Sequence, residues 1–248
     1  MAIDLEKCTG CQTCSVVCKM ENTNLPGEDW NLVNFFVEGE YPSMRLAWYP
    51  RPCMHCEKPS CLAVCPVSAT YKRTDGLVLI DWNKCIGCRY CIMACPYGAR
   101  YFPDEKAKVK PDLKDTYEGR RNKLWDPPYQ MLEIEQDARR GVGVPPKGVV
   151  TKCTFCAHRL DKISHTPDRN PVEDREFTPA CVVGCPSSAR HFGDIDDPDS
   201  KIRKKMVERP GFRLKDYLGN RPQVYYLTNV GGVPDDRKKI GTIRQRKD

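Results

Sequence analysis

Sixteen cysteines constrain this chain more than any other feature, because they fall into four groups of four. The groups are Cys8, Cys11, Cys14 and Cys18; Cys53, Cys56, Cys61 and Cys65; Cys85, Cys88, Cys91 and Cys95; and a split group, Cys153, Cys156, Cys181 and Cys185. No cysteine is left over. A cubane [4Fe–4S] cluster binds four thiolates, so the count predicts four such clusters and a chain that carries electrons.

The spacing within the groups is specific. In bacterial ferredoxins the run C-x2-C-x2-C-x3-C-P supplies three ligands to one cluster and its fourth cysteine to a second cluster. The third group matches this run and includes Pro96, whereas the first has Lys19 in place of the proline. The second group has four residues between Cys56 and Cys61, and the fourth contains a long insertion but still ends in Cys-Pro.

Local chemistry explains why these residue types recur. Gly10 and Gly87 each precede a cysteine, and glycine allows the positive φ that lets backbone amides approach a cluster. Cys14 and Cys18 are four residues apart, which predicts a helical turn between them. The last cysteine of a group can therefore reach away from the first three. The clusters are expected to form much of the core, so the apo chain should fold poorly.

Zinc and disulfide bonds are the alternatives for so many cysteines. Zinc sites usually combine two separated C-x2-C pairs, and a disulfide framework is typical of small secreted domains. A zinc-binding interaction module remains an alternative, because residues 201–248 hold 14 Lys and Arg against 5 Asp and Glu. A basic tail of this kind suits an acidic surface or nucleic acid, but solvated charge or a subunit contact is favoured.

An internal repeat gives the fold class. Short strands are predicted after three Cys-Pro turns, at Ser68–Tyr71, Gly98–Phe102 and Ser188–Phe192, with Asp75–Gly76 as a hairpin turn. Further strands are predicted at Ala2–Asp4, Val33–Val37 and Val224–Leu227. The pattern predicts an α+β chain of two ferredoxin-like two-cluster units with long loop insertions.

Polar residues beside the predicted ligands are candidates for tuning or contact. Basic residues next to ligands would raise a cluster potential, although each could equally be a solvated charge. These are Lys19, Lys84, Arg89 and Lys152. His55 and His158 could donate hydrogen bonds near a cluster, and Arg159 and Asp161 are candidates for a subunit contact.

No membrane-spanning or targeting segment is evident. No stretch approaches the roughly 18 apolar residues that a spanning helix needs. The start, MAIDLEKC, lacks the basic and apolar regions of a signal peptide. We expect membrane association only through a partner, on the cytoplasmic face or on the periplasmic face by co-export. We see no phosphate loop, dinucleotide fingerprint or nucleophile motif, so no active site is expected on this chain.

The order of the groups resembles a known family. The motifs are CTGCQTCSVVCK, PCMHCEKPSCLAVCP, DGLVLIDWNKCIGCRYCIMACPYGARYF, KCTFCAHRLD and ACVVGCPSSARHFGD. They resemble the iron–sulfur (beta) subunit of complex iron–sulfur molybdoenzymes, of the polysulfide, thiosulfate, tetrathionate, arsenate and dimethyl sulfoxide reductase type. The resemblance implies that this chain relays electrons between a molybdenum- or tungsten-pterin catalytic subunit and a quinone-reactive membrane anchor. The partner would act on a sulfur or arsenic oxyanion; a hydrogenase or formate dehydrogenase subunit is the alternative.

The resemblance also implies how the ligands are shared among four [4Fe–4S] clusters. The sets are Cys8, Cys11, Cys14 with Cys185; Cys153, Cys156, Cys181 with Cys18; Cys53, Cys56, Cys61 with Cys95; and Cys85, Cys88, Cys91 with Cys65. One ferredoxin-like unit would comprise residues 1–48 and 151–200, and the other residues 49–103. Residues 104–150 would be an insertion and residues 201–248 a basic C-terminal tail.

Overall fold

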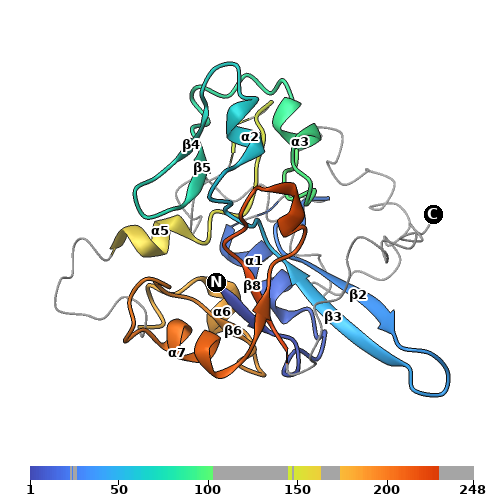
Figure 1. Ribbon diagram of the computed structural model, residues 1–248. Coiled ribbons are helices and arrows are strands. Elements are labelled where there is room, and N and C mark those ends of the chain that lie inside the picture. Colours follow the sequence, from blue (N-terminus) through green and yellow to red (C-terminus); the bar gives the residue numbers. More distant parts are fainter. Residues whose placement is uncertain (23, 25–26, 103–144, 147, 163–173, 229–248) are drawn as a thin grey trace, which may run out of the picture.

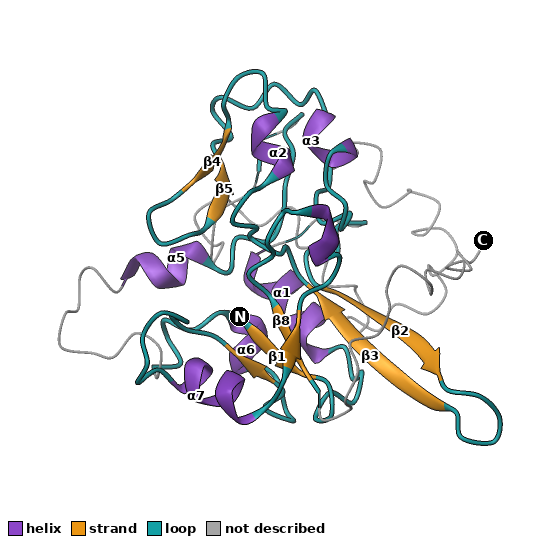
Figure 2. Cartoon of the chain, viewed as in Figure 1, coloured by secondary structure: helices purple, strands orange, loops and turns teal. Residues whose placement is uncertain are grey.

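The computed structural model describes residues 1–22, 24, 27–102, 145–146, 148–162 and 174–228 (Figure 1). Its elements are β1 (Ala2–Asp4), α1 (Thr13–Asn22), β2 (Leu32–Glu38), β3 (Arg45–Arg51), α2 (Ser60–Ala63), β4 (Thr70–Lys72), β5 (Val78–Ile80), α3 (Tyr90–Met93), α5 (Ala157–Leu160), α6 (Ala180–Val183), β6 (Arg190–His191), α7 (Lys201–Glu208), β7 (Gly211–Phe212), the 3-10 helix η7 (Asp216–Leu218) and β8 (Tyr225–Leu227). Figure 2 shows short helices and strands joined by long loops, which confirms the predicted mixture of helix and sheet.

One sheet joins the two ends of the described chain. Its strand order is β6-β1-β8-β7. Strand β1 pairs antiparallel with β6, with Ala2 opposite His191, and parallel with β8, with Ala2 opposite Tyr225. Ala2, Ile3 and Tyr226 are fully buried, so the sheet carries part of the core. The predicted strands at Ala2–Asp4 and Val224–Leu227 are therefore confirmed, and they lie side by side.

The cysteine-proline turns repeat in three dimensions. The third residue after the last cysteine is left-handed in three groups, with φ of 51° at Ser68, 57° at Gly98 and 50° at Ser188. The alanine that follows is buried in every copy. The strand predicted after Cys65 forms β4 and pairs antiparallel with β5 around the predicted turn, with Thr70 opposite Ile80. The sequence repeat is thus also a structural repeat.

The segment between the first two cysteine groups forms a hairpin. Strands β2 and β3 pair antiparallel, with Leu32 opposite Arg51, and Figure 1 shows the hairpin projecting from the rest of the chain. The predicted strand at Val33–Val37 is confirmed. At the base of the hairpin, Tyr49 is buried against Tyr226, with ring centroids 6.0 Å apart. The hairpin is therefore anchored to the central sheet.

Helix packing brings distant cysteine groups together. Helix α1, which carries Cys14 and Cys18, packs on α6, which carries Cys181. Helix α2 packs on α3, which joins the second group to the third. Figure 1 shows α2, α3, β4 and β5 at the top and α6, α7 and β6 at the bottom. The boundaries predicted for two ferredoxin-like units stay a prediction.

Residues 201–228 connect these regions. Although the charge count assigns them to a basic tail, they form α7, β7 and β8. The Tyr97 hydroxyl donates to the Leu214 carbonyl (3.1 Å), and the Gln223 amide donates to the Met54 carbonyl (2.8 Å). Most of the predicted insertion at 104–150, namely residues 104–144 and 147, lies outside the described residues, as do residues 229–248 of the predicted tail. No helix in the described part of the chain is long and apolar enough to cross a membrane.

Candidate metal centres

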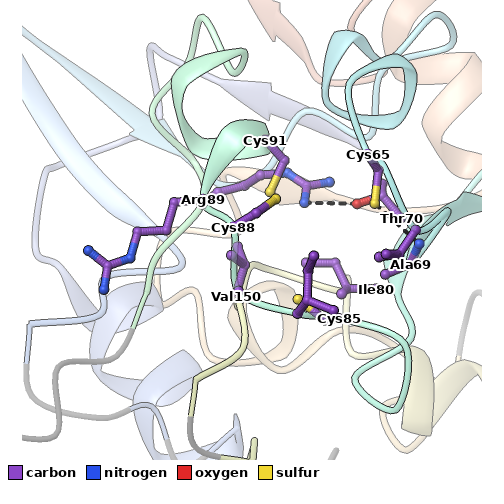
Figure 3. Close-up of a pocket in the computed structure, with 13 residues that line it drawn as sticks. Cys65, Ala69, Thr70, Ile80, Cys85, Cys88, Arg89, Cys91 and Val150 are labelled. Carbon is purple, nitrogen blue, oxygen red and sulfur yellow. Dashed lines mark hydrogen bonds between the residues drawn. The ribbon is translucent and has the colours of Figure 1, made fainter.

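The second and third cysteine groups line two hollows. One hollow is lined by Cys53, Cys56, Cys61 and Cys95. The other is lined by Cys65, Cys85, Cys88 and Cys91, whose side chains surround it in Figure 3. Each hollow takes three cysteines from one group and the last cysteine from the other. This is the crossed arrangement that the ferredoxin spacing suggests.

The first and fourth groups are interleaved in the same way. Cys18 lies within electrostatic reach of Cys153, Cys156 and Cys181, which raise its thiol pKa after the larger effect of burial. Cys8 has Cys14 and Cys185 as its thiol neighbours. Cys11 is exposed, and its sulfur lies 3.4 Å from the Thr13 hydroxyl. The structure therefore gathers fifteen of the sixteen predicted ligands into four crossed sets and leaves Cys11 at the edge of its set.

We name the sets by their place in a series. The outer sets are set A (Cys8, Cys11, Cys14, Cys185) and set D (Cys65, Cys85, Cys88, Cys91). The inner sets are set B (Cys18, Cys153, Cys156, Cys181) and set C (Cys53, Cys56, Cys61, Cys95). Neighbouring thiols connect them: Cys181 of set B interacts with Cys14, and Cys153 of set B interacts with Cys53.

Burial changes along this series. The two exposed cysteines, Cys11 and Cys88, belong to the two outer sets, whereas every cysteine of set B is buried. Set C is intermediate, because Cys56 is buried whereas Cys53, Cys61 and Cys95 are partly exposed. The most exposed cysteines therefore lie in the outer sets and the most buried set is set B.

The thiols need a positive partner in order to ionise. Burial, followed by repulsion from neighbouring thiolates, raises the pKa of both Cys56 and Cys153 to about 12. At neutral pH these thiols would keep their protons unless a metal core replaced them, because metal binding needs thiolate. The donor set therefore suits a cationic core and is unfavourable as free thiolate.

Hydrogen-bond donors already point at the sulfurs. The amides of Ala69 and Ala189 donate to Cys65 and Cys185 (3.2 and 3.3 Å), which are equivalent bonds in two copies of the repeat. The Asn22 amide reaches Cys18 at 3.6 Å and Cys156 at 3.9 Å. Nε and Nη1 of buried Arg190 have no partner among the described residues. Such donors suit the sulfur atoms of an iron–sulfur cluster, so the site fits the group.

A single metal ion fits less well. Among the described residues, which include all sixteen cysteines, no three His, Cys, Asp or Glu side chains converge closely enough to hold one ion. Zinc binds thiolate sulfur at about 2.3 Å, so its ligands must lie close together. A cubane presents four separate iron atoms at its corners, so its thiolates lie farther apart.

The residue before the second cysteine of each group is left-handed. Its φ is 69° at Gly10, 41° at His55, 68° at Gly87 and 54° at Phe155. The predicted positive φ of the two glycines is confirmed. A Cβ at Gly10 would overlap the Trp48 ring, and one at Gly87 would overlap the Gly148 carbonyl. The outer sets thus require glycine, whereas the inner sets carry two aromatic residues.

Gly87→Ala should destabilise the chain more than Gly76→Ala. Both glycines have positive φ, but nothing lies within 4 Å of a Cβ at Gly76. Left-handed strain alone should cost Gly76→Ala about 1–2 kcal/mol. Overlap with backbone should add about 1–3 kcal/mol at Gly87. Denaturant unfolding of the iron-loaded variants measures both, and equal losses would show that the Gly148 carbonyl moves away without penalty.

His55 and Phe155 join the ligand loops of the inner sets. Their rings stack at 3.9 Å with an interplanar angle of 21°. The Val78 amide donates to His55 Nδ1 (3.0 Å), so Nε2 carries the proton and donates to the Cys153 carbonyl (3.0 Å). Burial, the dominant cause, holds the pKa of His55 well below its usual value. The predicted hydrogen bond of His55 near a cluster ligand is confirmed, and it crosses between sets C and B.

Comparison with known proteins places the chain in a family. A model of the 4Fe-4S dicluster domain matches residues 44–113, which contain the second and third groups. A putative iron-sulfur subunit of dimethyl sulfoxide reductase from Halobacterium salinarum is 41% identical, over 97% of this chain and 83% of that protein. The arsenate respiratory reductase iron-sulfur subunit of Shewanella sp. is 36% identical, over 93% and 96%. A sulfite dehydrogenase subunit from Allochromatium vinosum is 34% identical, over 100% and 92%.

This chain belongs to the iron–sulfur subunit family of the complex iron–sulfur molybdoenzymes. The matches extend over 93–100% of this chain, so the likeness is not confined to one pair of cysteine groups. The resemblance stated from the motifs is therefore confirmed.

Most of the polar residues singled out from the sequence contact other residues of this chain. Lys19 pairs with Asp29 (2.7 Å), and Arg159 binds Glu21 through two nitrogens (2.6 and 2.7 Å). His158 also bonds Glu21 (2.8 Å), and Asp161 pairs with Arg73 (2.7 Å). Arg89 lies 3.9 Å over the Phe102 ring, and Lys84 lies 3.6 Å from Asp81. Lys152 differs, since it is buried and donates to the Cys153 carbonyl (2.7 Å).

Sequence reasoning missed two buried arginines, Arg100 and Arg190. The signal was present, because each stands five residues after the last cysteine of a group. Arg190 begins strand β6, whereas the strand predicted at Gly98–Phe102 is wrong, since only a single bridge forms there, between Tyr101 and Thr151. Nothing local marks these side chains as buried, however, since arginine is usually exposed. The thiol-rich surroundings that hold them come from segments distant in sequence.

Proposed function

We propose that this chain is the electron-transfer subunit of an oxidoreductase complex and holds four [4Fe–4S] clusters, one in each of sets A to D. When bound, these clusters would supply one-electron, outer-sphere transfer without bond chemistry. The chain's own residues would bind them, shield set B from water and direct hydrogen bonds at sulfur. The crossed sets would make two ferredoxin-like units, one holding sets A and B and the other holding sets C and D.

The observation that carries this proposal is the series of four thiol sets with exposed ends. Helix packing pairs the first group with the fourth and the second with the third. The His55–Phe155 stack joins the inner sets of the two pairs. A zinc-binding interaction module would need neither the crossing nor the graded burial.

The partners follow from the family. We propose that the outer sets face a molybdenum- or tungsten-pterin catalytic subunit at one end and a quinone-reactive membrane anchor at the other. Relatives named for arsenate reductase and sulfite dehydrogenase support a sulfur or arsenic oxyanion as the substrate of the catalytic partner. Membrane association would occur through the anchor, and no nucleic acid is proposed as a partner.

Metal analysis of the anaerobically purified complex tests the proposal. We expect about sixteen iron and sixteen acid-labile sulfide per chain, without stoichiometric zinc, and a brown colour that bleaches with dithionite. Stoichiometric zinc in a colourless protein would instead support the interaction module. Iron far below this level despite strict exclusion of oxygen would contradict four clusters.

A further inference from the structure

Two buried arginines occupy equivalent positions in the internal repeat. Arg100 follows Cys95 by five residues and Arg190 follows Cys185 by five, each after a left-handed turn and a buried alanine. They are only 4% and 3% exposed. Arginine is seldom buried without a paired charge. Among the described residues, neither forms a salt bridge with Asp or Glu, so the thiol sets supply the compensating charge.

Arg100 lies between sets C and D. Its side chain lines both hollows, the one with Cys61 and the one with Cys91. Nη2 donates to Cys61 Sγ (3.0 Å), and Nη1 donates to Thr70 Oγ1 (3.1 Å). Thr70 is the equivalent residue of the repeat copy that follows Cys65. Two hydrogen bonds thus hold the guanidinium in place, and Arg100 lines the hollows of both sets.

Arg190 occupies the corresponding place between sets A and B. Nη2 donates to Asn31 Oδ1 (2.8 Å), which holds the guanidinium in place. Nε and Nη1 are buried without a partner among the described residues. Arg190 interacts electrostatically with Cys181 of set B and with Cys14 of set A, so this cation also lies near two sets.

We propose that Arg100 and Arg190 are positioning charges that raise the reduction potentials of the two cluster pairs, Arg100 for sets C and D and Arg190 for sets A and B. This inference rests on the proposed function. A cubane with four thiolates has a net negative charge, and reduction adds one more. A fixed cation between two such groups in a low-dielectric site stabilises the reduced forms and lessens their mutual repulsion.

The test is a redox titration of the intact complex, monitored by electron paramagnetic resonance, for Arg100→Gln and Arg190→Gln. The signals are first assigned with one ligand variant for each set, Cys14→Ala, Cys181→Ala, Cys61→Ala and Cys91→Ala. We expect Arg100→Gln to lower the potentials of sets C and D by about 59 mV or more, a tenfold change in a one-electron equilibrium constant. Arg190→Gln should lower sets A and B instead, so each variant is the control for the other.

Further variants distinguish an effect of charge from an effect of packing. Arg100→Lys and Arg190→Lys keep the positive charge and should restore at least half of each lost potential. If the arginines acted only through packing, the lysine variants would not restore the potentials better than the glutamine variants. If a glutamine variant loses iron, Arg→Met fills the site with an apolar side chain and is titrated in its place. Unchanged potentials at full iron content, or equal shifts in all four clusters, would overturn the inference.

Iron content distinguishes the remaining outcomes. If every neutral variant loses iron while the lysine variants keep it, the arginines hold the thiolates together and do not tune potentials. If the unaltered complex itself lacks about sixteen iron, the proposed function fails. If it holds them and the potentials do not move, only this inference fails.

Discussion

Removal of the iron should unfold this chain, so that no folded apo form remains. Cys14, Cys18, Cys56, Cys153 and Cys181 are members of its main hydrophobic core, so the ligand sites and the core are the same region. Without clusters the thiols are protonated, because burial raises their pKa. Arg100 and Arg190 would then be buried cations without compensating charge.

The expected loss of free energy of unfolding is comparable to the whole stability of a typical domain. An unpaired buried charge costs about 3–5 kcal/mol, so two such arginines approach the about 5–15 kcal/mol that stabilises a typical domain. Anaerobic treatment of the complex with an iron chelator, followed by circular dichroism and thermal melting, measures the effect. We expect loss of the cooperative transition, with recovery on reconstitution by iron and sulfide. A native-like spectrum and an unchanged melting temperature in the apo chain would contradict the prediction.

Loss of Cys18 and loss of Cys181 should remove the same cluster, although these residues belong to different sequence groups. The sets in the structure place both in set B, whereas Cys14 and Cys185 belong to set A. Cys18→Ala and Cys181→Ala should each lose or convert one cluster. Complete loss lowers iron from about sixteen to about twelve per chain.

Electron paramagnetic resonance shows which cluster each variant has lost. The resonance signal missing from Cys18→Ala should match the one missing from Cys181→Ala and differ from that missing from Cys14→Ala and Cys185→Ala. The variants of set A, Cys14→Ala and Cys185→Ala, are the matched controls for the variants of set B, Cys18→Ala and Cys181→Ala. If Cys18→Ala and Cys14→Ala lacked the same signal, the ligands would be shared within sequence groups and the crossing would be wrong.

Local features were predictable from the sequence because they depend on neighbouring residues. The helix through Cys14 and Cys18, the turn at Asp75–Gly76 and the positive φ of Gly10 and Gly87 all arise from spacing and residue type. The strand at residues 224–227 was predictable for the same reason. Its parallel pairing with β1 was not, because β1 begins more than two hundred residues earlier.

The sequence by itself determined how many ligands this protein offers, how they are grouped and how each loop presents its sulfurs, since a two-residue interval and a left-handed residue act within one turn of chain. Only the tertiary structure decided which cysteines from distant groups share a hollow. It also placed the His55–Phe155 stack between the inner sets and Arg100 and Arg190 beside thiols. Burial and electrostatic surroundings depend on segments that meet only when the chain folds, so no local pattern of residues contains them.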